Sequence, residues 1–197
     1  MTEHGQGYED SGQPMIVVAE VWPVAADDLG LWLLSGDGPR PSLPVMDDSE
    51  PFDYAEMELM QAGMWATTKI LHSTSWRADH GALVVTYLAV VGCDGLVRSR
   101  WPDALPVSVK VADAVGQPPT HAAAEPPTVR YIDVLHHALR HLRFLTDPSS
   151  IGFDAPIAGE LDETWQQHLR TFEPAIARMY GREHRPLSPR TGAGPNG

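Results

Sequence analysis

The carboxylates best placed to do chemistry gather in one stretch, between residues 47 and 58. They are Asp47, Asp48, Glu50, Asp53, Glu56 and Glu58. Glu50, Asp53 and Glu56 could share one side of a loop and the first turns of a helix. Because carboxylate oxygens are the ligands that Mg²⁺ prefers, a divergent magnesium site is one hypothesis. We favour the other interpretation, a capped and solvated helix face whose acids complement the helix dipole.

A second group of candidates is the histidines of the segment 129–145, namely His136, His137 and His141. His137 and His141 are four residues apart, a spacing at which one helix could present both to a metal. However, Ala138 follows His137 where the zinc-protease motif has a glutamate. The leucines of this segment predict a buried stripe that leaves His137 and His141 near solvent. We therefore expect packing or surface histidines and no metal site.

Nucleophilic catalysis has little support in the sequence. His72 and Ser73 are adjacent in a predicted strand, so their side chains would point to opposite faces. No Gly-x-Ser-x-Gly elbow occurs. The single cysteine, Cys93, lies in a turn-like sequence after an apolar run and is expected to be a strand-end residue. One cysteine also excludes a disulfide framework.

Aromatic residues offer a different kind of site. The chain has six tryptophans, and for any single one core packing is the default. Trp76 stands beside Arg77 near a predicted turn, and His72 is close by in the sequence. These three residues are candidates for a ligand-binding or partner surface.

The composition limits the class of protein. A chain of 197 residues with 43% hydrophobic and 20% charged residues is typical of one globular domain. The net charge of −12, with lysine only at Lys69 and Lys110, argues against nucleic acid as a partner. The longest apolar run, 82–92, is too short to span a bilayer, and the N-terminal residues lack a signal-peptide pattern. We therefore expect a cytoplasmic protein without a membrane partner.

The elements that must position these residues follow from the hydrophobic pattern. We expect disordered tails at 1–13 and 182–197 around a single domain, 14–181. Strands are predicted at 15–22, 31–34, 66–75 and 82–91, the last of them central because it is apolar on both faces. Turns are predicted at 26–30 and 77–81, and loops at 36–44 and 101–128, the latter with a short strand at 107–111.

Three helices complete the prediction. The first runs over 51–62, ends at Gly63 and buries Phe52, Ala55, Leu59 and Ala62, with Met57, Met60 and Met64 widening the stripe. The others run over 129–145 and 161–180, the last kinked or broken by Pro174.

This order of elements resembles the Nudix family. The matching stretches are Leu43-Pro44, Ser49-Glu50-Pro51, Ala55–Leu59 and Ala62-Gly63-Met64, followed by Leu71–Ser73 and Val84–Leu88. They correspond to the family's Leu-Pro-Gly-Gly loop, its Gly-Glu-Ser turn, its Arg-Glu-Leu-x-Glu-Glu-x-Gly helix and the next strands. The resemblance covers residues 15–95. It implies an α/β (α+β) fold, in which a Nudix-like mixed sheet packs between helices, with additional helices at the C-terminal end.

The chain departs from the family at the positions that do the chemistry. Nudix hydrolysis needs clustered glutamates to hold divalent cations against a diphosphate. With Gly63 on the motif glycine, the glutamate positions fall on Met57, Met60 and Gln61. With Glu58 on the first glutamate, the pair falls on Gln61 and Ala62. Thioethers and amides are poor ligands for a hard cation.

Three hypotheses therefore stay open. The first, which we favour, is a catalytically degenerate Nudix-like module that binds a small nucleotide-like ligand or a protein partner without a cofactor. The second is a divergent Mg²⁺-dependent hydrolase of nucleoside-diphosphate-type substrates that uses Glu50, Asp53, Glu56 or Glu58. The third is a structural α/β domain unrelated to the family. The sequence leaves the oligomeric state open.

Overall fold

The computed structural model describes residues 15–36, 38–46, 48–107, 131–147 and 156–175. Both predicted tails, 1–13 and 182–197, lie outside the described residues. So do most of the predicted loop after residue 101 and the end of the last predicted helix. Those predictions stay untested.

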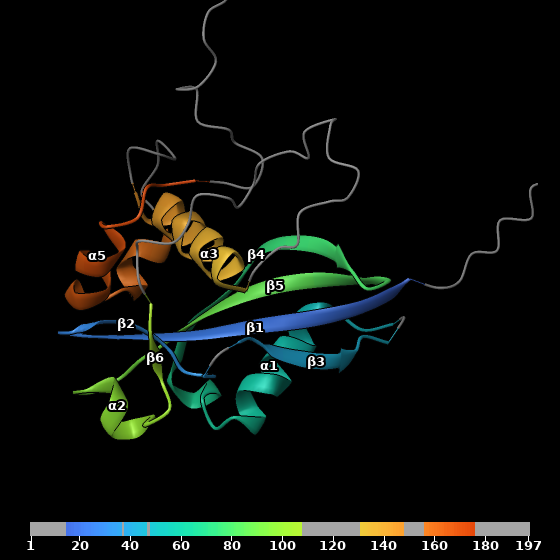
Figure 1. Ribbon diagram of the computed structural model, residues 1–197, viewed down its shortest axis with the longest axis horizontal. Coiled ribbons are helices and arrows are strands. Elements are labelled where there is room, and N and C mark those ends of the chain that lie inside the picture. The colour runs from blue at the N-terminus through green and yellow to red at the C-terminus, as the bar shows by residue number, and fades with distance from the viewer. Residues whose placement is uncertain (1–14, 37, 47, 108–130, 148–155, 176–197) are drawn as a thin grey trace, which may run out of the picture.

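The core is a six-stranded mixed sheet (Figure 1). Its strands are β1 (Ile16–Asp27), β2 (Gly30–Leu33), β3 (Arg40–Pro44), β4 (Thr68–Asp79), β5 (Ala82–Val91) and β6 (Leu105–Pro106). The order across the sheet is β4-β5-β1-β2-β6, and β3 also pairs with β1. β1 and β5 are parallel, whereas the other pairs are antiparallel. The predicted central position of 82–91 is confirmed.

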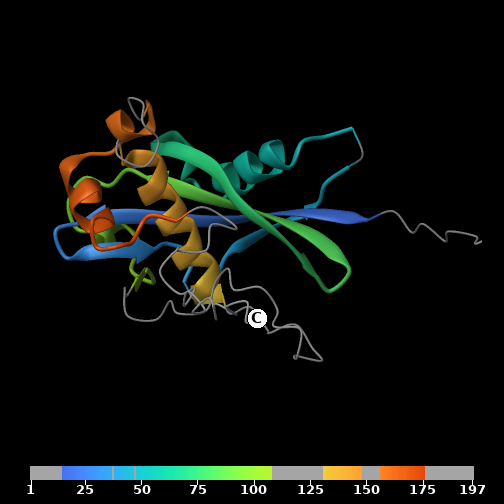
Figure 2. The same cartoon turned by 90° about the horizontal axis from the view of Figure 1, so that it is seen from above.

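Helices cover both faces of the sheet (Figures 1 and 2). The described α-helices are α1 (Pro51–Gln61), α2 (Val97–Arg100), α3 (Tyr131–Thr146) and α5 (Glu163–Leu169), with short 3₁₀ turns at Trp65–Thr67 and Pro156–Glu160. α1 packs on one face, and α3 with α5 on the other. The predicted α/β (α+β) fold class is confirmed. None of the helices described here has the length and apolar character needed to cross a membrane.

β1 supplies side chains to two cores. Trp22 and Val24 point to the core under α3 and α5, whereas Ala19, Val21 and Ala25 point to the core over α1. This alternation is the normal consequence of the two-residue repeat of a strand. A strand with both faces covered must be apolar on both, which explains the composition of the segment 15–27.

Asp27 fixes the end of β1. Its Oδ1 accepts hydrogen bonds from Trp32 Nε1 at 2.7 Å and Leu29 N at 2.9 Å, and its Oδ2 accepts one from Val97 N at 2.8 Å. Burial raises the pKa of Asp27, but these hydrogen bonds lower it by more, so the net shift is downward. The carboxylate thus joins the β1–β2 turn to the start of α2.

α1 has the predicted position but a narrower buried stripe. Ala55 and Leu59 are fully buried and Gly63 ends the helix with φ 67°. Phe52, Met57 and Met60 are exposed, contrary to prediction. The helix rests on the sheet along the Ala55–Leu59 line, so Met57 and Met60, which lie around the helix from that line, face solvent. Phe52 lies on the buried side but in the first turn, where it stays 37% exposed.

Four predicted boundaries were wrong. β1 and β4 extend into the predicted turns 26–30 and 77–81, as far as Asp27 and Asp79. The predicted loop 36–44 contains β3, which tolerates its two prolines because it is an edge strand with an irregular register against β1. The described strand β6 ends at Pro106, and the strand predicted at 107–111 lies outside the described residues except for Val107. α5 ends at Leu169, and its capping residue Arg170 precedes Pro174 by four residues.

Candidate ligand-binding site

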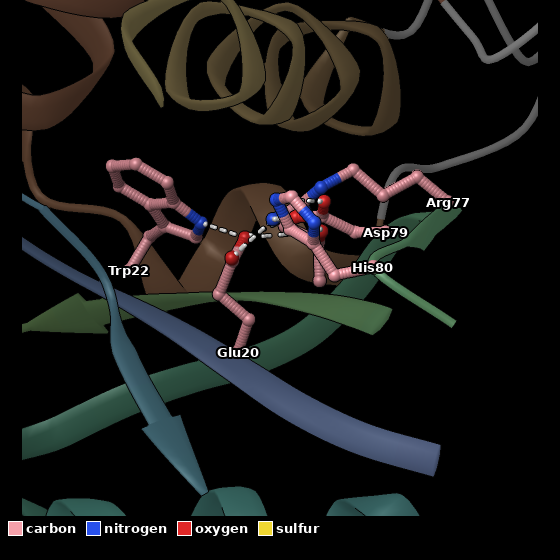
Figure 3. Close-up of polar contacts among 6 residues, drawn as sticks. Glu20, Trp22, Arg77, Asp79 and His80 are labelled. Carbon is pink, nitrogen blue, oxygen red and sulfur yellow. Dashed lines mark hydrogen bonds and ion pairs between the residues drawn. The ribbon is translucent and has the colours of Figure 1, made fainter. Parts of the chain in front are cut away.

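A buried ion pair lies on the sheet face that α3 covers. Glu20 of β1 is 4% exposed, an unusual position for a carboxylate. Arg77 of β4 meets it with two hydrogen bonds, from Nη1 to Oε1 at 2.9 Å and from Nη2 to Oε2 (Figure 3). Such a bidentate pair fixes both side chains in one geometry.

Neighbouring donors complete the shell around Glu20. Trp22 Nε1 donates to Glu20 Oε1 at 2.8 Å (Figure 3), and Arg77 Nη1 also reaches Thr86 Oγ1 at 3.3 Å. Asp79 Oδ2 lies 3.7 Å from Arg77 Nη2. The hydrogen bond with Glu20 raises the pKa of Arg77, whereas burial lowers it. The negative charges of Glu20 and Asp79 raise this pKa further, so the net shift is upward. The Arg77 guanidinium is therefore charged at every physiological pH.

A β-bulge decides which β4 residues reach this network. His72 pairs with Leu88 and Arg77 with Val84, but the register shifts by one residue between Ser73 and Ser75. Side chains of a regular strand alternate between its two faces, so residues five apart would normally lie on opposite faces. The extra residue of the bulge shifts this alternation by one, and His72 and Arg77 therefore both lie on the α3 face. Trp76 consequently lies on the opposite face of the sheet, the face on which α1 packs. The three predicted ligand-binding residues are therefore divided between two faces.

An apolar cavity shares Trp22 with the ion-pair network. It has a volume of about 130 Å³ and is lined mainly by Trp22, Leu33, Tyr131, Ile132 and Leu135. The rings of Trp22 and Tyr131 meet edge-to-face with centroids 6.0 Å apart. Trp22 therefore belongs to both features, because its indole nitrogen binds Glu20 while its ring lines the cavity.

Sequence reasoning missed Glu20, Trp22, Thr86 and Tyr131 as members of one site. A signal was present, because Glu20 is the only charged residue between Met15 and Ala26 in an otherwise apolar strand. A lone charge in a strand buried on both faces needs a partner from another strand. Which residue pairs with Glu20, however, depends on the bulge in β4, and no glycine or proline in the sequence marks that bulge.

Histidines occupy the interface between α3 and β4. The rings of His72 and His141 stack with centroids 5.5 Å apart and an interplanar angle of 11°. His137 is 8% exposed, so its predicted place near solvent was wrong. The reason is that α3 packs against β4 and β5 on one side and against α5 and the 156–160 turn on another.

Burial lowers the pKa of His72, His137 and His141. For His141 the pKa falls to about 4, because its neighbours His72 and His137 add to the effect of burial. For His137, Arg140 contributes as well. These side chains are therefore neutral at pH 7, and protonation would place positive charges against one another at the interface.

The acids around α1 do not converge on one point. Glu50 is the N-cap residue, and it and Asp53 are exposed, whereas Glu56 is half-buried. Glu58 turns toward β3, where its Oε2 lies 3.9 Å from Arg40 Nη2. Within the described part of the chain, no group of three or more histidine, cysteine or acidic residues is arranged to hold a metal ion.

Cys93 follows β5 closely, as the predicted strand-end residue should. It lines a cavity of about 280 Å³ together with Asp27, Asp28 and Asp162. Burial raises the pKa of the Cys93 thiol, whereas the positive charge of Arg100 lowers it. The nearby carboxylates of Asp27 and Asp94 raise it again, and the net shift is upward. A raised pKa disfavours the thiolate, which is the nucleophilic form.

Comparison with known proteins assigns no family to this arrangement. No protein-family model matches the chain, and no curated protein sequence matches it either.

Proposed function

We propose that this chain is a catalytically degenerate, Nudix-like binding module that holds a small ligand on the α3 face of its sheet. The observation that carries the proposal is the sharing of Trp22 between the Glu20–Arg77 pair and the apolar cavity. A rigid charged group beside an apolar recess is the usual composition of a ligand site.

The charge and the dimensions of this site limit which ligands can bind. Arg77 is partly exposed at 18% of its side chain, and guanidinium has five donors, more than Glu20 and Thr86 accept. A carboxylate or phosphate can therefore reach its open edge. The cavity of about 130 Å³ is well below the roughly 300 Å³ of small ligand pockets. It fits a small ring or a branched alkyl group, so the ligand is smaller than a nucleoside.

The geometry of α1 supports binding over hydrolysis. Metal-assisted attack on a diphosphate needs several carboxylates at one cation. Met57 and Met60, at two of the motif positions, point to solvent. Glu58, the acid nearest the motif, is paired with Arg40. Neither arrangement offers Mg²⁺ a set of oxygen ligands.

A phosphate-release assay separates the two functions. With nucleoside diphosphate derivatives and Mg²⁺ or Mn²⁺, we expect no release above the background of a protein-free control. Glu58→Gln should behave as wild type does. Turnover by the wild-type chain that Glu58→Gln abolishes would establish the hydrolase and exclude a purely binding module.

Ligand-dependent thermal stabilisation tests the site itself. The probes are phenyl phosphate, benzoate and isovalerate, which combine an anion with a small apolar group. At about 100 times Kd a ligand adds about 2.7 kcal/mol to the free energy of unfolding, which raises Tm by several degrees. Tyr131→Ala, which removes a wall of the cavity, should weaken binding at least about tenfold. Leu96→Ala is the control, because Leu96 is equally exposed but remote from the cavity. Equal loss in both variants, or no shift with any probe, would contradict the proposed site.

A further inference from the structure

Another cavity lies where the C-terminal ends of α3 and α5 meet. It has a volume of about 330 Å³, and the Pro156–Glu160 turn supplies part of its wall. Arg143 comes from the last turn of α3, and Arg170 is the capping residue at the end of α5. Both line the cavity, which we call the arginine cavity. No described residue lines both it and the cavity beside Trp22.

Neither guanidinium of the arginine cavity is fully engaged. Arg143 Nη2 pairs with Asp147 Oδ2 at 2.9 Å, but Arg143 Nε is buried and meets no acceptor among the described residues. Arg170 is exposed, and within the described part of the chain its side chain forms no ion pair. Because a guanidinium has five N–H donors, both arginines retain donors for a ligand.

The helix ends do not account for these arginines. A cation near a helix C-terminus can offset the dipole and bond the last carbonyl groups. Here other donors meet those groups. Thr146 Oγ1 donates to Arg143 O at 3.1 Å, at the end of α3. Phe172 N donates to Leu169 O at 3.0 Å, at the end of α5. Two separate helix ends also do not require both guanidiniums to line one cavity.

The charge of the arginine cavity selects an anion. Its two guanidiniums and the Asp147 carboxylate leave one net positive charge, although the whole chain carries −12. A phosphate monoester has three acceptor oxygens and about 1.5 to 2 negative charges at pH 7, so it can pair with both guanidiniums at once. A carboxylate has two oxygens and one charge, which a single guanidinium satisfies.

The wall of the arginine cavity also offers acceptors. Gln166 Nε2 donates to Leu161 O at 3.0 Å, which orients the amide, and Gln166 Oε1 meets no donor among the described residues. A carboxylate such as that of Asp147 accepts several hydrogen bonds at once. A bare anion uses none of these acceptors, whereas hydroxyl groups beside the anion can donate to them.

We propose that the arginine cavity binds a small phosphate monoester that carries hydroxyl groups, that is, a phosphorylated polyol. Its volume of about 330 Å³ is at the lower end of the roughly 300–1,000 Å³ of small-molecule sites, which suits such a ligand. The proposal is independent of the site at Arg77, because it rests on different residues at the other end of α3.

The test is titration calorimetry of the full chain with glycerol phosphate as the probe. We expect one saturable site whose affinity falls with added salt. Propyl phosphate, which has the same carbon chain without hydroxyls, should bind about fivefold more weakly or less tightly still. Dimethyl phosphate, a diester with one charge, should bind at least about tenfold more weakly. Equal affinities for glycerol phosphate and propyl phosphate would overturn the proposed ligand class.

Arg170→Gln should weaken the binding of glycerol phosphate at least about tenfold, because it removes a charge-assisted hydrogen bond. Arg170 is exposed, so the variant should keep the wild-type Tm. Arg98→Gln is the matched control, since it removes the same charge from an exposed arginine outside the cavity and should bind as wild type does. Equal weakening in both variants, or no binding by wild type, would overturn the proposal.

Two cross-checks separate the arginine cavity from the site at Arg77. Tyr131→Ala should bind glycerol phosphate as wild type does, and Arg170→Gln should keep the wild-type response to benzoate. Failure of one proposal is therefore distinguishable from failure of the other. Loss of glycerol phosphate binding in Tyr131→Ala but not in Arg170→Gln would place the phosphate at the other site and contradict this one.

Discussion

Replacing Arg77 with leucine is expected to lower the free energy of unfolding by about 3–5 kcal/mol. The substitution leaves Glu20, which is 5% exposed at its side chain, charged and buried without its partner. The cost is mainly that of the uncompensated carboxylate rather than the lost attraction. Chemical denaturation at pH 7 measures it.

A second substitution separates these two causes. Glu20→Gln/Arg77→Leu removes both charges but keeps an oxygen for Trp22 Nε1, so it should recover about 2 kcal/mol of the loss. Arg98→Leu is the control, since Arg98 is exposed and should change stability by less than about 1 kcal/mol. If the double variant is no more stable than Arg77→Leu, the buried charge is not the cause.

Acidification from pH 7 to pH 5 is expected to remove about 2 kcal/mol of stability through His141 alone. The pKa of His141 is about 4 in the folded chain, against 6.5 for an exposed histidine. Between these values the unfolded state binds more protons, so stability is full above pH 6.5 and falls as the pH approaches 4. His72 and His137, whose pKa values are also lowered, add to the loss.

His141→Gln should flatten the pH dependence of the unfolding free energy between pH 7 and pH 5. His80→Gln is the matched control, because the side chain of His80 is 98% exposed at the β4–β5 turn. Asp27 and Asp162 have lowered pKa values and lose their contribution only below about pH 3.8, outside this window. An unchanged slope in His141→Gln would show that the histidine interface does not titrate as proposed.

The elements predicted correctly are those whose apolar pattern is contained in a few consecutive residues of the sequence. The near-unbroken apolar run 82–91 became β5 with its boundaries unchanged, and α1 begins at Pro51 as predicted. In both, the signal is contained within a few consecutive residues. The Ala55–Leu59 contact with the sheet likewise follows from helical spacing alone.

The site was predicted only in part because it depends on pairing between distant strands. Arg77 was a candidate residue, yet its partner Glu20 is 57 residues away. The bulge between Ser73 and Ser75, which turns Trp76 to the other face, follows from the register against β5. The burial of His137 depends on α5 and the 156–160 turn. None of these is encoded in a local repeat.

The parallel pairing of β1 with β5 has a consequence for how the chain folds. Glu20 of β1 and Thr86 of β5 stand opposite each other in the sheet, yet they lie 66 residues apart in the sequence. The apolar strand β1 is synthesised first but cannot be paired along this edge until β5 has emerged. Closing so long a loop is entropically costly, and sheets dominated by such contacts fold slowly. Until then the nascent chain carries a hydrophobic strand with one unpaired edge, a state in which aggregation competes with folding.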